Sequence, residues 1–376
     1  MTYGEAELLR IAKRQNNAKR SYLLVNPLQA KHLPVSPSAA LAMMSRLGET
    51  LAEKYPHSRL LIGFAETATA IGAAAAKCLG NDCIYLATTR EPYTDGTWIE
   101  FLEEHSHATE QRLFATKLAE WIHQTESVIL LDDELSTGKT LRNMVCQLRQ
   151  HFPELTKKKM VAASILNRLT EENEHLLEEA GIQSEYLLKL PERDFSRELL
   201  SVETKEAREP RPLECRISCL PFPKALANPR FGLAIGSYHA DCQRLSQAVL
   251  KAMETDLAAA GRILVLGTEE CMFPALCLGA NIESHFPDAS VYCHATTRSP
   301  IGISSKQGYP ITEGVRLSSL YDATRTTYLY NLAPYDLVLV LTDAMSPSDT
   351  ALQALQAALL QHGSKNIVFL LPGKER

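Results

Sequence analysis

Three things are scarce in this chain: paired cysteines, long apolar runs and an excess of charge of one sign. The 376 residues include nine cysteines at irregular spacings, without a Cys-x-x-Cys pair or a signal peptide. This pattern favours reduced thiols in a cytoplasmic protein. No apolar run approaches membrane-spanning length. A net charge of −5 and a pI near 6.2 provide no global field for nucleic acid. We therefore expect a cytoplasmic protein with neither nucleic acid nor membrane as a partner.

The composition and the element pattern indicate an α/β protein. Apolar content of 45% and charged content of 22% are globular values, and the length predicts two domains. Before residue 125 the chain alternates between helix and strand. The expected helices are 38–55, an alanine-rich helix into which residues 63–70 turn and which ends near residue 80, and 108–124. The expected strands are 59–62, 83–87 and 98–102. This order predicts a doubly wound sheet that binds ligands outside the carboxyl ends of its strands.

The segment Ser127–Thr140, with the sequence SVILLDDELSTGKT, carries the clearest chemical signal. The apolar run Val128–Leu131 predicts a buried parallel strand, with Asp132 and Asp133 at its end. The following helix is predicted from apolar residues at helical spacing, namely Leu141, Met144, Val145 and Leu148. The loop between them therefore leads into a helix N-terminus.

That loop is suited to a phosphate group. The backbone N–H groups and the dipole at a helix N-terminus attract anions, and Gly138 allows close backbone approach. The residues expected to hold the phosphate are Ser136, Thr137, Gly138, Lys139 and Thr140. A P-loop would require glycine where Asp133 stands. Paired carboxylates instead suit the vicinal hydroxyls of a sugar, so we expect a sugar phosphate as the ligand.

The segment resembles the PRPP motif of the type I phosphoribosyltransferases. The resemblance implies that Asp132 and Asp133 bind the ribose hydroxyls and that the loop binds the 5′-phosphate. It places the pyrophosphate at the turn formed by Glu66, Thr67, Ala68 and Thr69. Arg90 ends the neighbouring strand and is expected to bind pyrophosphate oxygens, the alternative being an exposed, salt-bridging arginine. Mg²⁺ is expected as a cofactor bound mainly through PRPP or pyrophosphate, and no metal ligand of the chain's own is predicted.

The segment around His105 and His107 leaves three interpretations open. A His-x-His pair beside two glutamates suits a transition metal, but no further ligand is identified. Its place after the expected lid loop instead favours contact with the substrate. A solvated start of a helix is the alternative. Tyr22–Val35 and Asn167–Leu190 are the segments expected to bind the acceptor.

The second half of the chain repeats parts of the first. Ala87–Pro92 recurs as Ala295–Pro300 with five identities, and Arg59–Gly63 matches Ile263–Gly267. The apolar run 338–341 stands where the PRPP strand is expected. In this copy Thr342, Ser348 and Asp349 replace Asp132, Gly138 and Lys139, which predicts an internal duplication whose second site has lost PRPP chemistry.

We expect two Rossmann-like domains, each a mainly parallel sheet flanked by helices. Residues 1–195 form the predicted phosphoribosyltransferase domain, 196–228 a linker and 229–376 the degenerate copy. The chain resembles the phosphoribosyltransferases of bacterial tellurite-resistance and stress gene clusters, whose C-terminal TRSP domain is named for the motif present here as Thr297–Pro300. The lid-like loop Ser304–Gly308 supplies Lys306. Arg298 and Lys306 are expected to act on the first site or on a distinct ligand.

The resemblance implies a pentosyltransferase that moves ribosyl phosphate between PRPP and a base-like acceptor, or runs the reverse phosphorolytic or pyrophosphorolytic reaction. The acceptor is not identified. The alternatives are a PRPP-binding regulator and a nucleotide-binding scaffold, neither of them catalytic. The two halves are expected to pair as an intrachain pseudodimer, and a homodimer is possible.

Overall fold

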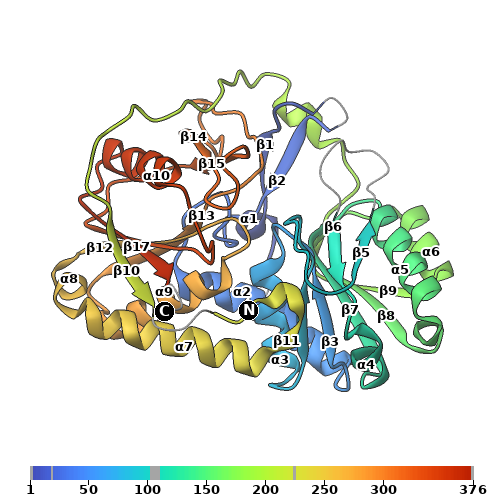
Figure 1. Cartoon of the computed structure of the whole chain (residues 1–376). Helices are drawn as coiled ribbons and strands as arrows, with labels where there is room; N and C mark the ends of the chain where they lie inside the picture. Colours follow the sequence, from blue (N-terminus) through green and yellow to red (C-terminus); the bar gives the residue numbers. More distant parts are fainter. Residues whose placement is uncertain (1–2, 18–19, 102–110, 223–225, 374–376) are drawn as a thin grey trace. The chain divides into compact units, whose positions relative to one another are not determined.

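The computed structural model (Figure 1) describes residues 3–17, 20–101, 111–222 and 226–373. Its contacts divide the chain into two compact units. The 42–192 unit also contains residues 227–241. The 242–376 unit also contains residues 1–41 and 193–226. The division thus differs from consecutive domains, since the first 41 residues and most of the expected linker pack with the C-terminal half.

The 42–192 unit is built on a six-stranded sheet with the order β11-β4-β3-β7-β8-β9. All neighbours are parallel except β11, which is antiparallel to β4. Its strands are β3 (Leu60–Gly63), β4 (Ile84–Ala87), β7 (Ser127–Leu135), β8 (Lys159–Asn167), β9 (Ile182–Lys189) and β11 (Leu233–Ala234), with a separate hairpin of β5 (Trp98–Phe101) and β6 (Gln111–Phe114). Its helices are α3 (Thr69–Leu79), α4 (Leu118–His123), α5 (Lys139–His151) and α6 (Glu171–Glu179), with short 3₁₀ helices η1 (Pro153–Lys157) and η3 (Pro229–Phe231).

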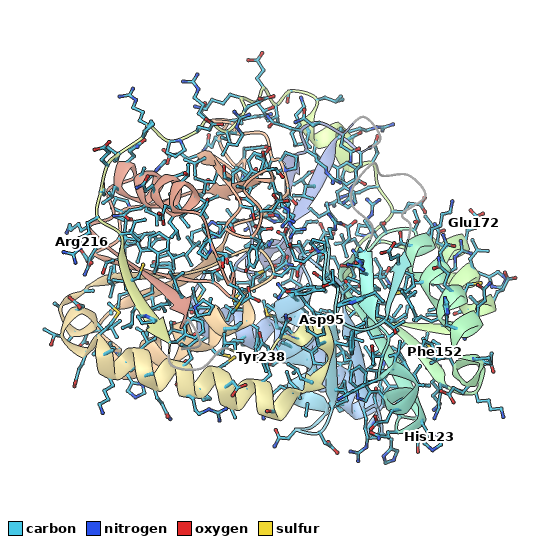
Figure 2. All side chains as sticks on the ribbon, in the orientation of Figure 1. Asp95, His123, Phe152, Glu172, Arg216 and Tyr238 are labelled. Atoms are coloured by element: carbon cyan, nitrogen blue, oxygen red, sulfur yellow. The ribbon has the colours of Figure 1, made fainter. Side chains whose placement is uncertain are left out.

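Alternating side chains of these strands bury two faces of the sheet. Leu60, Ile62 and Leu130 share one core with residues of α4, α5 and α6, and Figure 1 shows α5 and α6 beside each other. Phe152, labelled in Figure 2, ends α5 and packs against the same core. Helix α3 contacts β3, β4 and β7. Its alanines and Gly72 allow close packing, because a Cβ at Gly72 would lie 2.8 Å from the Tyr85 ring.

The 242–376 unit is built on a five-stranded parallel sheet with the order β10-β17-β16-β12-β13. Its strands are β10 (Ser218–Phe222), β12 (Arg262–Gly267), β13 (Ser290–Ala295), β16 (Leu337–Leu341) and β17 (Asn366–Pro372), with hairpins β1 (Arg10–Lys13) to β2 (Tyr22–Val25) and β14 (Gly314–Ser318) to β15 (Thr326–Tyr330). Its helices are α1 (Glu5–Leu8), α8 (Glu254–Ala259), α9 (Phe273–His285), α10 (Asp349–Gln361) and the 3₁₀ helix η2 (Phe195–Leu199). Helices α2 (Pro37–Lys54) and α7 (Ile235–Ala252) each run from one unit into the other.

The two sheets have the same strand order at four positions. The order β4-β3-β7-β8 in one unit corresponds to β13-β12-β16-β17 in the other. An antiparallel strand pair lies in the chain between β4 and β7 in one unit and between β13 and β16 in the other. Thr89 bridges Arg112 in one unit, and Thr297 bridges Tyr328 in the other. The fifth position differs, because β9 follows β8 in the chain whereas β10 precedes the other four strands of its sheet. Strand β10 lies within residues 196–228, which were expected to form a linker. Part of this segment therefore belongs to a sheet.

One other local expectation was wrong, and one predicted strand is confirmed but extends further than expected. The predicted helix 108–124 is replaced, within the described residues, by strand β6 and the short helix α4. Residues 111–114 pair with β5, so tertiary pairing overrides their helix propensity. The predicted strand 128–131 continues to Leu135, with Asp132 opposite Ser164 and Glu134 opposite Leu166 of β8. The paired carboxylates therefore lie on the last part of a strand.

Candidate active site

Asp132 and Asp133 lie half-buried near the carboxyl end of β7. The Asp133 backbone N–H donates to Asp132 Oδ1 at 2.9 Å. Burial, followed by the neighbouring Asp133 charge, raises the pKa of the Asp132 carboxyl well above its usual range. The next carboxylate, Glu134, has a different partner, since its Oε1 lies 3.0 Å from Arg168 Nε. The end of the strand thus holds two adjacent carboxylates, which repel each other when both are ionised.

The predicted phosphate loop lies directly after these carboxylates. Gly138 precedes α5 with φ 66°, a left-handed conformation that favours glycine. A Cβ at this position would also lie 3.2 Å from the Leu177 side chain. Thr137, Lys139 and Thr140 are exposed, at the start of a 13-residue helix. This arrangement presents hydroxyls, an ammonium group and a helix N-terminus to solvent, which suits a phosphate group.

A cavity of about 110 Å³ is lined by both Asp132 and the predicted phosphate loop. Its polar lining includes Asp132, Glu134, Gln111 and the loop 136–140. Its apolar lining consists of Phe64, Phe101, Leu135, Leu141 and Met144. The cavity is therefore polar at the strand end and apolar towards α5.

The predicted pyrophosphate turn reaches the same edge of the sheet. Thr67 Oγ1 donates to Asp133 Oδ1 at 3.0 Å, and this contact joins the turn after β3 to the carboxylates of β7. Glu66 is 8% exposed and follows a cis peptide bond from Ala65. Thr69 Oγ1 donates to the Glu66 carbonyl oxygen at 3.2 Å, at the start of α3. Ala68 is buried and precedes that helix.

Arg90 follows β4, the neighbour of β3, and is half-buried. Its Nε is enclosed without a hydrogen-bond partner, and within the described part of the chain its side chain forms neither a hydrogen bond nor an ion pair. Because β4, β3 and β7 are parallel, Arg90 stands at the same edge as the turn and the carboxylates. The alternative, that Arg90 forms a salt bridge, is not supported, because no carboxylate among the described residues pairs with it.

The other predicted residues lie elsewhere. His105 and His107 fall outside the residues that the structure describes. Arg298 and Lys306 belong to the 242–376 unit, where Lys306 Nζ donates to Ser201 Oγ at 2.7 Å. Tyr22–Val35 also belongs to that unit, whereas Asn167–Leu190 lies in the 42–192 unit. Across the described ranges no group of three or more His, Cys, Asp or Glu side chains is placed to hold a metal ion.

In the 242–376 unit the corresponding position holds an ion-pair network. Arg298 Nε lies 2.6 Å from Glu269 Oε2, and Arg325 contacts the same oxygen at 3.1 Å. Ser319 donates a short hydrogen bond to the other Glu269 oxygen. Glu269 is 1% exposed. The carboxylate of this unit thus neutralises the arginine that corresponds to Arg90.

Comparisons with known proteins show the family of the chain. The family model described as phosphoribosyl transferase matches residues 8–190, and the TRSP domain that follows it in that family matches residues 227–359. The chain belongs to this phosphoribosyltransferase family with a C-terminal TRSP domain. No curated protein matches the chain.

Similar solved structures are also phosphoribosyltransferases. The adenine enzyme of Giardia lamblia, solved with 9-deazaadenine, is 13% identical with a TM-score of 0.36, over 49% of this chain and 95% of its own. The orotate enzyme of Aeropyrum pernix is 17% identical with a TM-score of 0.31, over 50% of this chain and 89% of its own. Among the helices of the described residues, none is both long and apolar enough to cross a membrane.

Sequence reasoning missed three polar residues of the site. Arg168 holds Glu134, while Thr88 and Gln111 hydrogen-bond to each other at 2.6 Å. Thr88 lies in the repeated Ala-Thr-Thr-Arg sequence, which is the one signal that marks it. Gln111 and Arg168 carry no local pattern, because strand pairing alone brings them to this edge.

Proposed function

We propose that the 42–192 unit binds PRPP and transfers its ribosyl phosphate group to a base-like acceptor, or catalyses the reverse reaction. The observation that carries this proposal is the hydrogen bond from Thr67 to Asp133. It joins the turn proposed for pyrophosphate to the carboxylates proposed for ribose, and the phosphate loop follows directly. Three subsites in this order correspond to the three parts of PRPP.

Each residue has a proposed task. Asp132 and Asp133 accept hydrogen bonds from the ribose 2′ and 3′ hydroxyls and orient C1. The N-terminus of α5, with Gly138 and the neighbouring hydroxyls, binds the 5′-phosphate. Arg90 and the turn 66–69 bind the pyrophosphate and stabilise the negative charge that it gains as its bond to C1 breaks. Ionised carboxylates are required for the ribose contacts, so binding weakens when Asp132 is protonated.

Mg²⁺ fits the donor set of this site. The adjacent carboxylates of Asp132 and Asp133 repel each other and offer oxygen ligands, which Mg²⁺ prefers. The described residues provide no complete protein cage, so PRPP oxygens would supply further ligands. When bound, the ion would neutralise charge on the pyrophosphate.

We also propose that the 242–376 unit is a duplicated copy without PRPP chemistry. The shared strand order supports a common origin, and Thr342 stands where the other copy has Asp132. The ion pair of Arg298 with Glu269 supports a structural task for Arg298 in place of the predicted contact with a ligand. A contact of Lys306 with a ligand stays a prediction, as do the pseudodimer and the homodimer.

From the family resemblance we place the reaction in a bacterial stress or tellurite-resistance pathway in the cytoplasm. The second candidate is a PRPP-binding regulator or scaffold without catalysis. The same subsites would serve such a protein, and the half-buried Asp132 favours neither reading.

Pyrophosphate release with Mg²⁺, PRPP and a panel of purine, pyrimidine and other bases separates the two candidates. Release that depends on one base and is lost in D133N supports the enzyme. Tight PRPP binding without release on any base supports the regulator.

A further inference from the structure

A closed ring of hydrogen bonds fixes the residue that precedes the pyrophosphate turn. The Ala65 N–H donates to Thr88 Oγ1 at 2.8 Å, and the Thr88 hydroxyl donates to Gln111 Oε1 at 2.6 Å. Gln111 Nε2 completes the ring by donating to the Ala65 carbonyl oxygen at 2.9 Å. All three residues are buried, with exposed fractions of 5%, 0% and 9% for Ala65, Thr88 and Gln111.

The ring requires a side chain that both accepts and donates. The Ala65 N–H uses the Thr88 oxygen as its acceptor, so the Thr88 hydroxyl hydrogen is directed to Gln111. The Gln111 amide then needs its oxygen on one side and its N–H on the other. Glutamate in the ionised form loses the donor, and leucine loses both groups. Buried polar groups left unpaired are costly, so the peptide groups of Ala65 would move to find other partners.

Gln111 also faces the site. It lines the cavity together with Asp132 and the phosphate loop, and it begins strand β6. Ala65 stands immediately before Glu66, the first residue of the turn. The ring therefore links the wall of the cavity to the backbone of the turn proposed for pyrophosphate.

We propose that Gln111 is a positioning residue, which holds the turn 66–69 in the conformation that binds the pyrophosphate group of PRPP. The proposal rests on the function proposed for this unit. Gln111 acts through Ala65 and Thr88. The carboxylates of β7 and the phosphate loop are not members of this ring of hydrogen bonds. Loss of Gln111 thus weakens the pyrophosphate subsite selectively.

The other copy offers an internal comparison. Thr296 Oγ1 accepts from the Glu269 N–H at 3.0 Å, as Thr88 accepts from Ala65. The bridges of Thr89 to Arg112 and of Thr297 to Tyr328 align Gln111 with Thr327. Thr327 is buried, but its side chain has no amide. The complete ring is thus present in the copy that kept the paired carboxylates.

Calorimetry with two probes tests this assignment, with Mg²⁺ present throughout. PRPP occupies all three proposed subsites, and ribose 5-phosphate occupies those for ribose and phosphate alone. We expect Q111L to weaken PRPP binding about tenfold or more, which is about 1.4 kcal/mol or more, since the Gln111 amide no longer holds the residue before the turn. Its affinity for ribose 5-phosphate should stay within about twofold of that of the original chain. A twofold change is about 0.4 kcal/mol, which is the deviation expected when a mutation lies outside the binding subsites.

Two variants of Thr88 test the proposal even if Q111L does not fold. T88V removes the hydroxyl at nearly constant volume and should also weaken PRPP binding selectively, whereas T88S keeps the hydroxyl and should retain the affinity. T296V makes the same change in the 242–376 unit and should leave PRPP binding unaltered. Unchanged PRPP affinity in both Q111L and T88V would overturn the proposal. Failure of the original chain to bind PRPP would instead overturn the proposed function, and the proposal with it.

Discussion

Glu269 is shared by Arg298 and Arg325, whose nitrogens lie 2.6 and 3.1 Å from the same carboxylate oxygen. The carboxylate is buried, and Ser319 donates to its other oxygen. A buried carboxylate between two arginines makes this network a structural element of the 242–376 unit. Arg90, which has the matching place in the repeated Ala-Thr-Thr-Arg sequence, has no such carboxylate partner among the described residues, in keeping with the proposal that it binds a ligand.

Removing the shared carboxylate should destabilise the protein strongly. We expect E269Q to lower the free energy of unfolding by about 3–5 kcal/mol, because both arginines lose a buried counter-charge. E209Q is the control, since Glu209 pairs with Arg316 at 2.9 Å on the exposed surface and should cost about 0–1 kcal/mol. Urea unfolding measures both variants. Equal costs would show that the Glu269 network contributes no more than a surface pair.

Arg90 and Arg298 should respond in opposite ways to the same substitution. R90M should weaken PRPP binding about tenfold or more, because a charge-assisted phosphate contact is lost. It should leave ribose 5-phosphate binding and the melting temperature nearly unchanged, because no ion pair with another described residue is broken. R298M should lower the melting temperature and leave PRPP binding unaltered. Calorimetry and thermal unfolding of the two variants test this. Weaker PRPP binding in R298M would instead give the TRSP arginine a ligand.

Asp132 should limit stability at neutral pH. Its folded-state pKa is raised by burial and by Asp133, so the carboxyl stabilises the fold at low pH and this contribution is lost as the pH rises through that pKa. D132N removes the charge. We expect its melting temperature to exceed that of the original chain by about 2–4 °C at pH 8, corresponding to about 1 kcal/mol. The difference should shrink at pH 5, and a difference independent of pH would contradict the assignment.

Much of the fold follows from local patterns in the sequence. Continuous apolar runs located β3, β4, β7, β12 and β16 to within a few residues, because strands covered on both faces need such runs. Helical spacing of Leu141, Met144 and Leu148 located α5, and all three are buried. The carboxylates and the phosphate loop could be predicted together because they belong to one uninterrupted segment.

The remaining features depend on contacts between distant segments. Residues 1–41 pack with the C-terminal half, β10 joins β17, and β6 replaces a predicted helix by pairing with β5. Gln111 reaches Ala65 across 46 positions of the chain. Local propensity contains no information on such pairings, and so the ring around Ala65 was visible only in three dimensions.

Gly138 should be needed for phosphate binding. G138A places a side chain in the left-handed region and 3.2 Å from Leu177, which should cost about 1–2 kcal/mol and shift the loop. We expect ribose 5-phosphate to bind about tenfold more weakly, as a loss of about 1.4 kcal/mol implies. G363A is the control, because Gly363 has φ 86° in the 242–376 unit and should lose stability without loss of binding. Equal binding in both variants would separate the loop from phosphate recognition.

The most direct test of PRPP binding at the end of β7 is calorimetry of the chain and of its D132N/D133N variant with PRPP and Mg²⁺. The unaltered chain should bind one PRPP, since the 242–376 unit has Thr342 in place of Asp132. The double variant should remain folded and show no measurable PRPP binding. Unchanged affinity in the double variant would contradict the assignment of these carboxylates to the ribose.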